Sequence, residues 1–420
     1  MTFLRGAMLF RDLKSFSMGL ALAYTAACGG DSPVAPEPTP PPVTAPVPQP
    51  PPVPQAPALT VFGNGSVTER FTGEVWVHGN VAYTTTWGTR QAPGNAVKIW
   101  DVSGNVPVLR DSLIISGAGT LGDAQVTDDG KLLIVATEPS PGSIVIYDLA
   151  DPLKPKLITR YSTPNTEGGV HTAEIQRVNG RLYGFLSVDP RAGAPARLTI
   201  VDLADPALPR EVYSQVMGRP FVHDVFVRDG ILFTALWDGG VSIFDIGGAG
   251  AGTPANPLPI SNTLTVGGQA HNIAWPRLAS GARYAFVGEE DRATLFSFSS
   301  GDIHVLDVSN LASPREVAFF NVPGAGTHNF SVDEGRGILY AAYYNGGVRA
   351  IDITGDLGTC TAAQKSADGR CDLGKMRREK ATGLLGQQSV FVWGVHLSGG
   401  SLYASDMPNG LWKLGLAPVN

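Results

Sequence analysis

An apolar run that ends in aspartate recurs along most of this chain, and it constrains the possible fold more than any other feature. The aspartates that end the six clear copies are Asp101, Asp148, Asp202, Asp245, Asp307 and Asp352. A seventh copy, LWKLG, ends at Gly415. The copies lie roughly 43 to 62 residues apart, which is the range of β-propeller blades. This period predicts one structural unit per copy, with each unit stacked against its neighbours.

Each unit has the patterning of four strands. A second run, rich in β-branched and aromatic residues, precedes each copy, and Asp-Gly or Asn-Gly turns separate several of the pairs. A further strand leads each unit and another follows it, except that the seventh unit lacks its last strand. The segment ALTVFGNGS near the start resembles that missing strand. We therefore predict an all-β, seven-bladed β-propeller over residues 59–420, closed by an N-terminal strand that completes the last blade.

Two of the repeated strings resemble a known family. LTIVDLADP and IHVLDVSNLASP are similar to the LVIVD repeat of bacterial and archaeal surface proteins, and residues 327–354 resemble the propellers of choice-of-anchor B proteins. The resemblance covers nearly all of residues 59–420 and implies a propeller fold. It implies little about activity, because propellers host many unrelated functions.

The N-terminal segment has the pattern of an export signal. Residues 1–27 hold a basic stretch followed by an apolar one that is too short to span a membrane. The segment resembles a bacterial lipoprotein signal, which implies a lipid on Cys28. Because Thr25 stands where such signals prefer leucine, ordinary secretion is the alternative. Residues 28–58 are dense in proline and predict an extended tether. We expect a location in the bacterial cell envelope, at the outer membrane or cell surface or in the periplasm, with contact to the membrane through the lipid alone.

The remaining cysteines and the net charge limit the partners. Cys360 and Cys371 lie in a polar insertion that we expect to be a solvated loop, and export favours a disulfide between them over two free thiols. The net charge of −6 and the lack of a basic run argue against nucleic acid as a partner. We expect a monomer that binds a small ligand or a protein.

Four of the seven histidines occupy one position of the repeat, at the start of the innermost strand. They are His171, His223, His271 and His328, and we call them the histidine arc. Innermost strands surround the centre of a propeller, so these imidazoles should face a common space at the mouth of its channel. Imidazole suits Fe, Cu and Zn, and the arc is therefore a candidate metal site. The alternative is a set of structural histidines that gene duplication copied and hydrogen bonds satisfy.

Polar residues beside the arc could orient or complete such a site. Metal-bound histidines usually donate their second N–H to a carboxylate or carbonyl group. The candidate ligand-binding residues are Asp224, Asn272, Asn329, Glu174, Glu289 and Glu290. The other histidines, His78, His304 and His396, are predicted to be structural or surface residues. The repeated aspartate is interpreted as a cap of the turn that follows it.

Common catalytic motifs are missing from the sequence. It contains no GxSxG elbow, HExxH helix, phosphate loop or dinucleotide fingerprint. We therefore favour an envelope-anchored binding or interaction module that acts through the mouth of its channel. The alternative is a metal-dependent, oxidoreductase-like enzyme that uses the histidine arc.

Overall fold

The computed structural model describes residues 56–88, 92–138, 141–191, 193–218, 220–387 and 389–418. The predicted signal peptide, Cys28 and the tether as far as residue 55 lie outside the described residues. Within the described part, no helix has the length and apolar character needed to cross a membrane.

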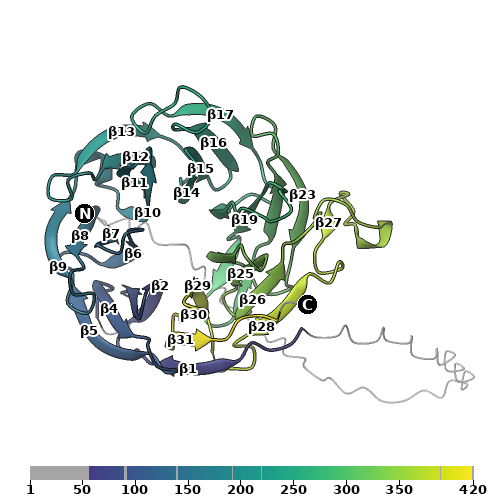
Figure 1. Ribbon diagram of the computed structural model, residues 1–420, viewed down its shortest axis with the longest axis horizontal. Helices are drawn as coiled ribbons and strands as arrows, with labels where there is room; N and C mark the ends of the chain where they lie inside the picture. The colour runs from purple at the N-terminus through teal and green to yellow at the C-terminus, as the bar shows by residue number, and fades with distance from the viewer. Residues whose placement is uncertain are drawn as a thin grey trace, which may run out of the picture. The chain divides into compact units, whose positions relative to one another are not determined.

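Seven sheets form a ring, each with four antiparallel strands, of which one lies nearest the centre and one at the rim (Figure 1). One of the sheets has an additional parallel strand at its outer edge. This arrangement confirms the predicted all-β, seven-bladed propeller. Two single-turn 3₁₀ helices, η1 (Pro164–Thr166) and η2 (Ala362–Gln364), are the only helical segments in the described ranges. In the first six blades the chain runs from the innermost strand outwards, whereas the outermost strand of blade seven comes from the start of the described chain.

The first four blades follow one pattern without insertion. Blade one comprises β2 (Phe71–His78), β3 (Val81–Trp87), β4 (Ala96–Asp101) and β5 (Val108–Ile114). Blade two comprises β6 (Thr120–Val126), β7 (Leu132–Glu138), β8 (Ser143–Asp148) and β9 (Lys156–Tyr161). Blade three comprises β10 (Val170–Val178), β11 (Arg181–Val188), β12 (Arg197–Asp202) and β13 (Arg210–Val216). Blade four comprises β14 (Asp224–Arg228), β15 (Ile231–Ala235), β16 (Val241–Asp245) and β17 (Leu258–Thr263).

The last three blades carry the insertions and the closure. Blade five comprises β18 (Ala270–Ala274), β19 (Tyr284–Glu289), β22 (Ile303–Asp307) and β23 (Arg315–Phe320). Blade six comprises β24 (Phe330–Asp333), β25 (Ile338–Ala342), β26 (Val348–Asp352) and β28 (Glu379–Gly383). Blade seven comprises β29 (Val392–Ser398), β30 (Ser401–Asp406), β31 (Gly410–Leu414) and β1 (Val61–Gly65).

The repeated aspartate ends the third strand of its blade and caps the next turn. Asp101 Oδ1 accepts a hydrogen bond of 3.0 Å from the N–H of Ser103, two residues further on. The five other copies make the same bond at 2.9–3.1 Å. The interpretation as a turn cap is therefore confirmed. The apolar run before each aspartate is continuous because a sheet in the ring is covered by a neighbour on both faces.

The hydrophobic core is divided among the junctions between blades. Seven clusters of buried side chains lie one at each junction, as where Ile134 and Ala136 of blade two pack near Val170 and Ile175 of blade three. Each blade is therefore stabilised by two neighbours, which is why closure of the ring matters. Strand β1 closes it by pairing antiparallel with β31, with Val61 opposite Leu414. The predicted closing strand is confirmed.

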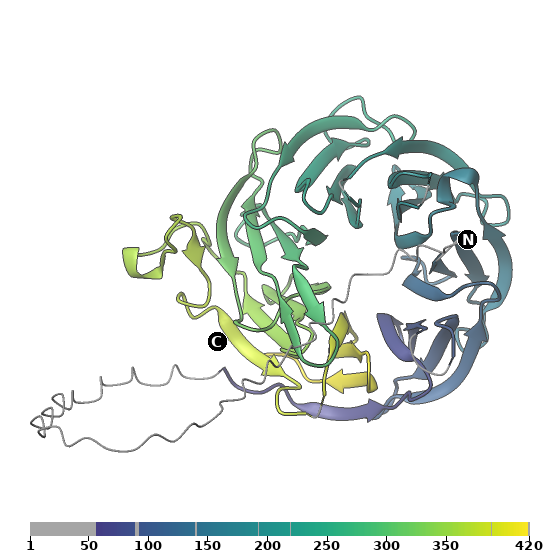
Figure 2. The same cartoon turned by 180° about the vertical axis from the view of Figure 1, so that it is seen from behind.

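Two segments depart from the four-strand pattern. A hairpin of β20 (Arg292–Thr294) and β21 (Phe298–Ser300) is inserted in blade five. The polar insertion of blade six forms β27 (Cys371–Asp372), which pairs parallel with β23 and adds a fifth strand to blade five. This segment lies outside the rim of the ring (Figure 2). The expectation of a solvated loop was therefore wrong for these residues, because the outer edge of β23 offers unpaired backbone groups. A disulfide joins Cys360 to Cys371.

Candidate metal centre

The structure places the histidine arc in one continuous row. The ring centroids of successive histidines, from His171 through His223 and His271 to His328, lie 4.3, 4.1 and 4.2 Å apart. His223, His271 and His328 are buried, and His171 is partly exposed. Four imidazoles from four neighbouring blades therefore line one side of the centre of the ring.

The remaining blades cannot extend the arc, for reasons visible in the backbone. Blade two has Gly122 at the arc position, where an added Cβ would lie 1.9 Å from the carbonyl oxygen of His171. Blade one has Gly73, where a Cβ would lie 2.5 Å from Thr85 Oγ1. In blade seven the indole of Trp393 packs on His328 with ring centroids 4.0 Å apart. The arc therefore ends at the glycines of blades one and two on one side and at the indole of Trp393 on the other.

A second repeat position faces the arc, and we call its members the rim residues. Each lies at, or one or two residues after, the end of the second strand of its blade. The rim residues are Trp87, Glu138, Asp189, Trp237, Glu290, Tyr344 and Met407. Of the rim residues, only Glu290 was among the candidates from the sequence, because the strands end at different distances from the turn. Trp237 and Tyr344 both begin a turn of the form aromatic–Asp/Asn–Gly–Gly, and an alignment on that turn would have revealed the position.

Glu290 completes a three-residue group that we call the inner cluster. Its Oε2 lies 3.6 Å from His271 Nε2 and 3.9 Å from His223 Nε2. One ligand atom from each of the three residues lies within 4.8 Å of the other two. Within the described part of the chain, Glu290 Oε2 and both ring nitrogens of His271 are buried and have no hydrogen-bond partner. Buried polar atoms are normally paired, so an ion that accepts their lone pairs would explain the group.

The two histidines of the inner cluster are in the protonation state that metal binding requires, whereas burial of Glu290 favours its protonated form. Burial, together with the charge of neighbouring histidines, holds the pKa of His223 and of His271 well below the usual value, so the imidazoles are neutral. Burial raises the pKa of Glu290 to about 7, although a hydrogen bond from the Tyr344 hydroxyl to Oε1 opposes this rise. His328 Nδ1 lies 2.7 Å from the carbonyl oxygen of Trp393, to which it donates, so its Nε2 carries a free lone pair.

His171 belongs to a separate group, the outer cluster, with Glu138 and Asp189. His171 Nδ1 lies 2.9 Å from Glu138 Oε1 and 3.8 Å from Asp189 Oδ2. Burial alone would lower the pKa of His171, but the charges of Glu138 and Asp189 raise it to about 10. The three side chains are 13–23% exposed, compared with 3–7% in the inner cluster.

Four of the predicted ligand-binding residues lie beside the arc in other surroundings. Asn329 donates a hydrogen bond to Glu74, which sequence analysis had not singled out. Burial, and then the charge of Asp123, raises the pKa of Asp224 to about 7 and that of Glu74 to about 8. Burial and the charge of Asp224 raise the pKa of Glu174 well above its usual value. The carboxamide oxygen of Asn272 is buried and has no hydrogen-bond partner among the described residues.

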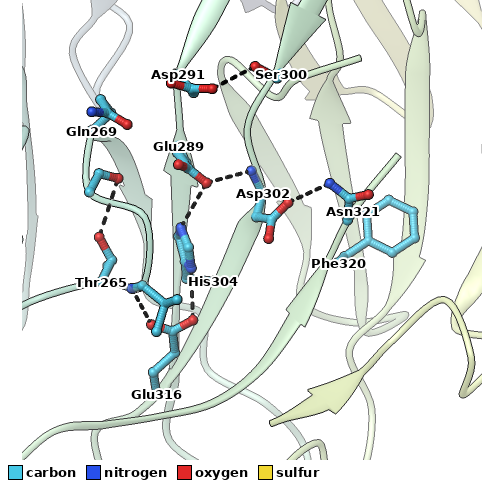
Figure 3. A network of polar contacts seen from close by, with 12 residues as sticks. Thr265, Gln269, Glu289, Asp291, Ser300, Asp302, His304, Glu316, Phe320 and Asn321 are labelled. Atoms are coloured by element: carbon cyan, nitrogen blue, oxygen red, sulfur yellow. Dashed lines mark hydrogen bonds and ion pairs between the residues drawn. The ribbon is translucent and has the colours of Figure 1, made fainter. Parts of the chain in front are cut away.

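Glu289 points away from the arc, toward the body of blade five (Figure 3). Its Oε2 accepts a hydrogen bond of 3.0 Å from the N–H of Asp302 and lies 3.4 Å from His304 Nε2. The other ring nitrogen of His304 lies 2.8 Å from Glu316, which Arg370 also contacts. Burial opposes the charge on His304, yet hydrogen bonds to the two carboxylates raise its pKa to about 9. Of these two adjacent glutamates, only Glu290 therefore faces the histidine arc, whereas Glu289 contacts His304.

The comparisons with known proteins agree with the repeat. The sequence model of the LVIVD repeat family matches residues 297–322, which include β21, β22 and β23. No curated protein matches the chain. The crystal structure of Sqt1 from Saccharomyces cerevisiae is similar, with a TM-score of 0.52 and 10% identity over 83% of each chain, and at this identity it shows the fold alone. A repeat propeller of this kind is typical of interaction modules. The chain is a seven-bladed β-propeller, and its fifth blade carries a match to the LVIVD repeat.

Proposed function

We propose that this chain is an envelope-anchored, metal-dependent propeller that binds a transition-metal ion on His223, His271 and Glu290. The ion would act on, or help to bind, a small ligand at the mouth of the channel. One observation carries the proposal: Glu290 Oε2 and His271 Nε2 lie 3.6 Å apart, both buried, and neither has a hydrogen-bond partner in the described ranges.

The number and type of ligands support a working site over a structural one. Structural zinc sites use four protein ligands, whereas catalytic sites keep a coordination position open. Two imidazoles and one carboxylate are the ligand set of many zinc hydrolases and of non-haem iron oxygenases. The neighbouring indoles of Trp237 and Trp393 would exclude water from one side of the ion and strengthen its electrostatic effect on a bound ligand.

Metal analysis of the full chain, purified in detergent, tests the proposal. After removal of metal with a chelator, the chain is loaded with Zn²⁺, Fe²⁺ or Cu²⁺ in turn, and retained metal is measured after gel filtration. We expect the His223→Ala, His271→Ala double variant to hold one ion fewer than the wild type. The matched control is His78→Ala, whose histidine is exposed at the end of β2. Equal metal in the double variant and the wild type, with circular dichroism unchanged, would overturn the proposal.

The anchoring part of the proposal rests on Cys28 and the proline-rich tether, which lie outside the described residues. A lipid on Cys28 would hold the chain at a membrane without a spanning helix. In a bacterial host, we expect wild-type protein in the membrane fraction and Cys28→Ala protein in the soluble fraction, as detected by immunoblotting. An unchanged distribution in the variant would show that no lipid is attached there.

An interaction module that needs no metal is the second candidate. The β20–β21 hairpin exposes Phe296 and Phe298 to 38% and 43%, and Phe296 also packs on Phe71 of blade one and on Phe391. Exposed apolar side chains that stand on an inserted hairpin are typical of a partner contact. Cross-linking in cells should give a product that Phe296→Ser, Phe298→Ser protein lacks, whereas His223→Ala, His271→Ala protein keeps it.

A further inference from the structure

The two clusters beside the arc draw on the same two repeat positions, the arc and the rim residues. The inner cluster has two imidazoles and one carboxylate, and the outer cluster has one imidazole and two carboxylates. Acidic rim residues occur only in blades two, three and five, beside the arc, while the other four blades have an aromatic residue or methionine there. The rings of His171 and His223 lie 4.3 Å apart, so the outer cluster begins where the inner cluster ends.

The ligand atoms of the outer cluster have the spacing that a bound ion requires. Metal bonds of about 2.0–2.2 Å to nitrogen and oxygen put neighbouring ligand atoms about 3–3.5 Å apart. The observed distances from His171 Nδ1 are 2.9 Å to Glu138 and 3.8 Å to Asp189, and one atom from each residue lies within 4.8 Å of the others. Small movements of the side chains, together with release of the proton that His171 Nδ1 shares with Glu138, would therefore bring all three atoms onto one ion.

The backbone around the outer cluster leaves room for this geometry. Gly122 takes the arc position of blade two, and a Cβ there would lie 3.0 Å from Glu138 Oε1. Gly169 lies on another side, and its Cβ would lie 3.5 Å from Glu138 Cγ. Glycine at both positions lets the backbone come close to the carboxylate without covering it.

We propose that Glu138, His171 and Asp189 hold a second divalent transition-metal ion beside the first, so that the arc carries a two-metal centre. The pairing of the ions rests on the proposed function, but the outer ion uses none of the inner ligands. Its ligands are 13–23% exposed, so it is the ion that solvent and substrate reach first. Two adjacent ions can clamp the oxygen atoms of one group, and the fitting ligand is a small oxyanion that bridges them.

Zinc stoichiometry of the full chain in detergent is the test. Four proteins are stripped of metal, loaded with Zn²⁺ and measured after gel filtration: the wild type, Glu138→Gln with Asp189→Asn, His223→Ala with His271→Ala, and a control. The control is Asp151→Asn with Asp205→Asn, which changes two exposed aspartates in surface turns. We expect two ions in the wild type and in the control, and one in each of the other two variants.

Other results separate the two proposals. One ion in the wild type that the histidine variant loses and the acid variant keeps would overturn the second ion and leave the inner site standing. One ion with the reverse pattern would support the outer site and overturn the inner one. If the acid variant does not fold, Mn²⁺ bound to the wild type decides: a spin-coupled pair in the electron paramagnetic resonance spectrum supports two adjacent ions, and an isolated six-line signal overturns them.

Discussion

Tyr344 illustrates how one residue of this propeller serves both the backbone and the candidate site. Its φ of 42° is rare for a residue with a side chain and costs energy that the surrounding contacts must offset. In this conformation its ring packs on His328, with centroids 5.1 Å apart, and its hydroxyl donates to Glu290. The left-handed turn thus aims an aromatic hydroxyl at the carboxylate that completes the inner cluster.

Loss of that hydroxyl should weaken metal binding. Tyr344→Phe keeps the ring but removes the hydrogen bond that favours ionised Glu290, so the pKa of Glu290 should rise and fewer molecules should be ready to bind metal near pH 7. We expect roughly tenfold weaker Zn²⁺ binding, as is usual when a group that supports a ligand is lost. Competition with a fluorescent chelator measures it. Tyr343→Phe is the matched control, because the Tyr343 hydroxyl bonds to Phe320 instead. Equal affinities for Tyr344→Phe and the wild type would contradict this role of the hydroxyl.

At the scale of residues, the direction in which a side chain points could not be predicted from the sequence. The four histidines could be predicted because they occupy one readable position of the repeat. The opposite directions of Glu289 and Glu290 depend on where β19 ends, and a shift of one residue would exchange their surroundings. Asp189 was missed because it follows the end of β11 in a loop without a Gly-Gly turn, and its neighbour Glu138 comes from another blade.

At the scale of elements, the insertion of blade six protects the edge of blade five. Strand β27 pairs with β23 through Ala318 and Cys371, and Arg370 beside it contacts Glu316. The disulfide from Cys371 to Cys360 holds this short strand in place. A two-residue strand could not be read from composition, because its pairing depends on a partner edge in a different blade. The β20–β21 hairpin escaped prediction for a different reason: its two strands of three residues pair only with each other and are too short to show an alternating pattern.

Removal of the disulfide should therefore loosen the insertion without opening the ring. The two cysteines are 11 residues apart, and a loop of this size corresponds to about 2–3 kcal/mol of unfolding free energy. We expect Cys360→Ser, Cys371→Ser protein to lose that amount in urea unfolding and to keep the far-ultraviolet circular dichroism of the wild type. Reduction of the wild type should have the same effect, while reduction of the variant should have none. A variant as stable as the wild type would show that β27 is held by its other contacts.

At the scale of the whole molecule, burial raises the pKa of several acidic side chains at the centre of the propeller, so that they keep their protons at higher pH than usual. The propeller itself was predictable, because a sheet covered on both faces needs a continuous apolar run and six of the seven runs here end in a capping aspartate. The acidic centre was not, because pKa shifts arise from burial and from neighbours in other blades. Glu74 of blade one is an example: burial, with the charge of Asp123 of blade two, raises its pKa to about 8.

The stability of the metal-free chain should therefore fall as the pH rises above about 6.5. Below that pH, His223 and His271 act in the opposite direction, because their pKa is held well below the ordinary 6.5 and the unfolded chain binds the extra protons. In the unfolded chain Glu74 loses its proton near its ordinary pKa of 4.5, while the folded chain keeps it until about pH 8. Across that window deprotonation favours the unfolded state. His171 acts in the same direction, since its folded pKa of about 10 lies above the ordinary 6.5. Stability from its charge is therefore complete below pH 6.5 and is lost as the pH rises through 10.

Thermal unfolding with a chelator present, between pH 6.5 and pH 9, measures this effect. We expect the melting temperature of the wild type to fall by several degrees over the range. Glu74→Gln cannot ionise and should fall less, whereas the surface variant Asp205→Asn should follow the wild type. A melting temperature that rises with pH would mean that the buried acids are already ionised in the folded chain.

The pairing of β1 with β31 also determines when the ring can close during synthesis of the chain. Asn64 bonds to the carbonyl oxygen of Leu411, which lies 347 residues further along the chain. At ribosomal rates of about 5–20 residues per second, the first strand waits roughly 20 to 70 s for its partner to be synthesised. During that time the ring has an open seam, and blades one and six lack the neighbour that blade seven provides. Strand β31 is thus the strand whose synthesis allows the ring to close. A chain interrupted before β31 would leave β1 unpaired and the ring open, in addition to being shorter.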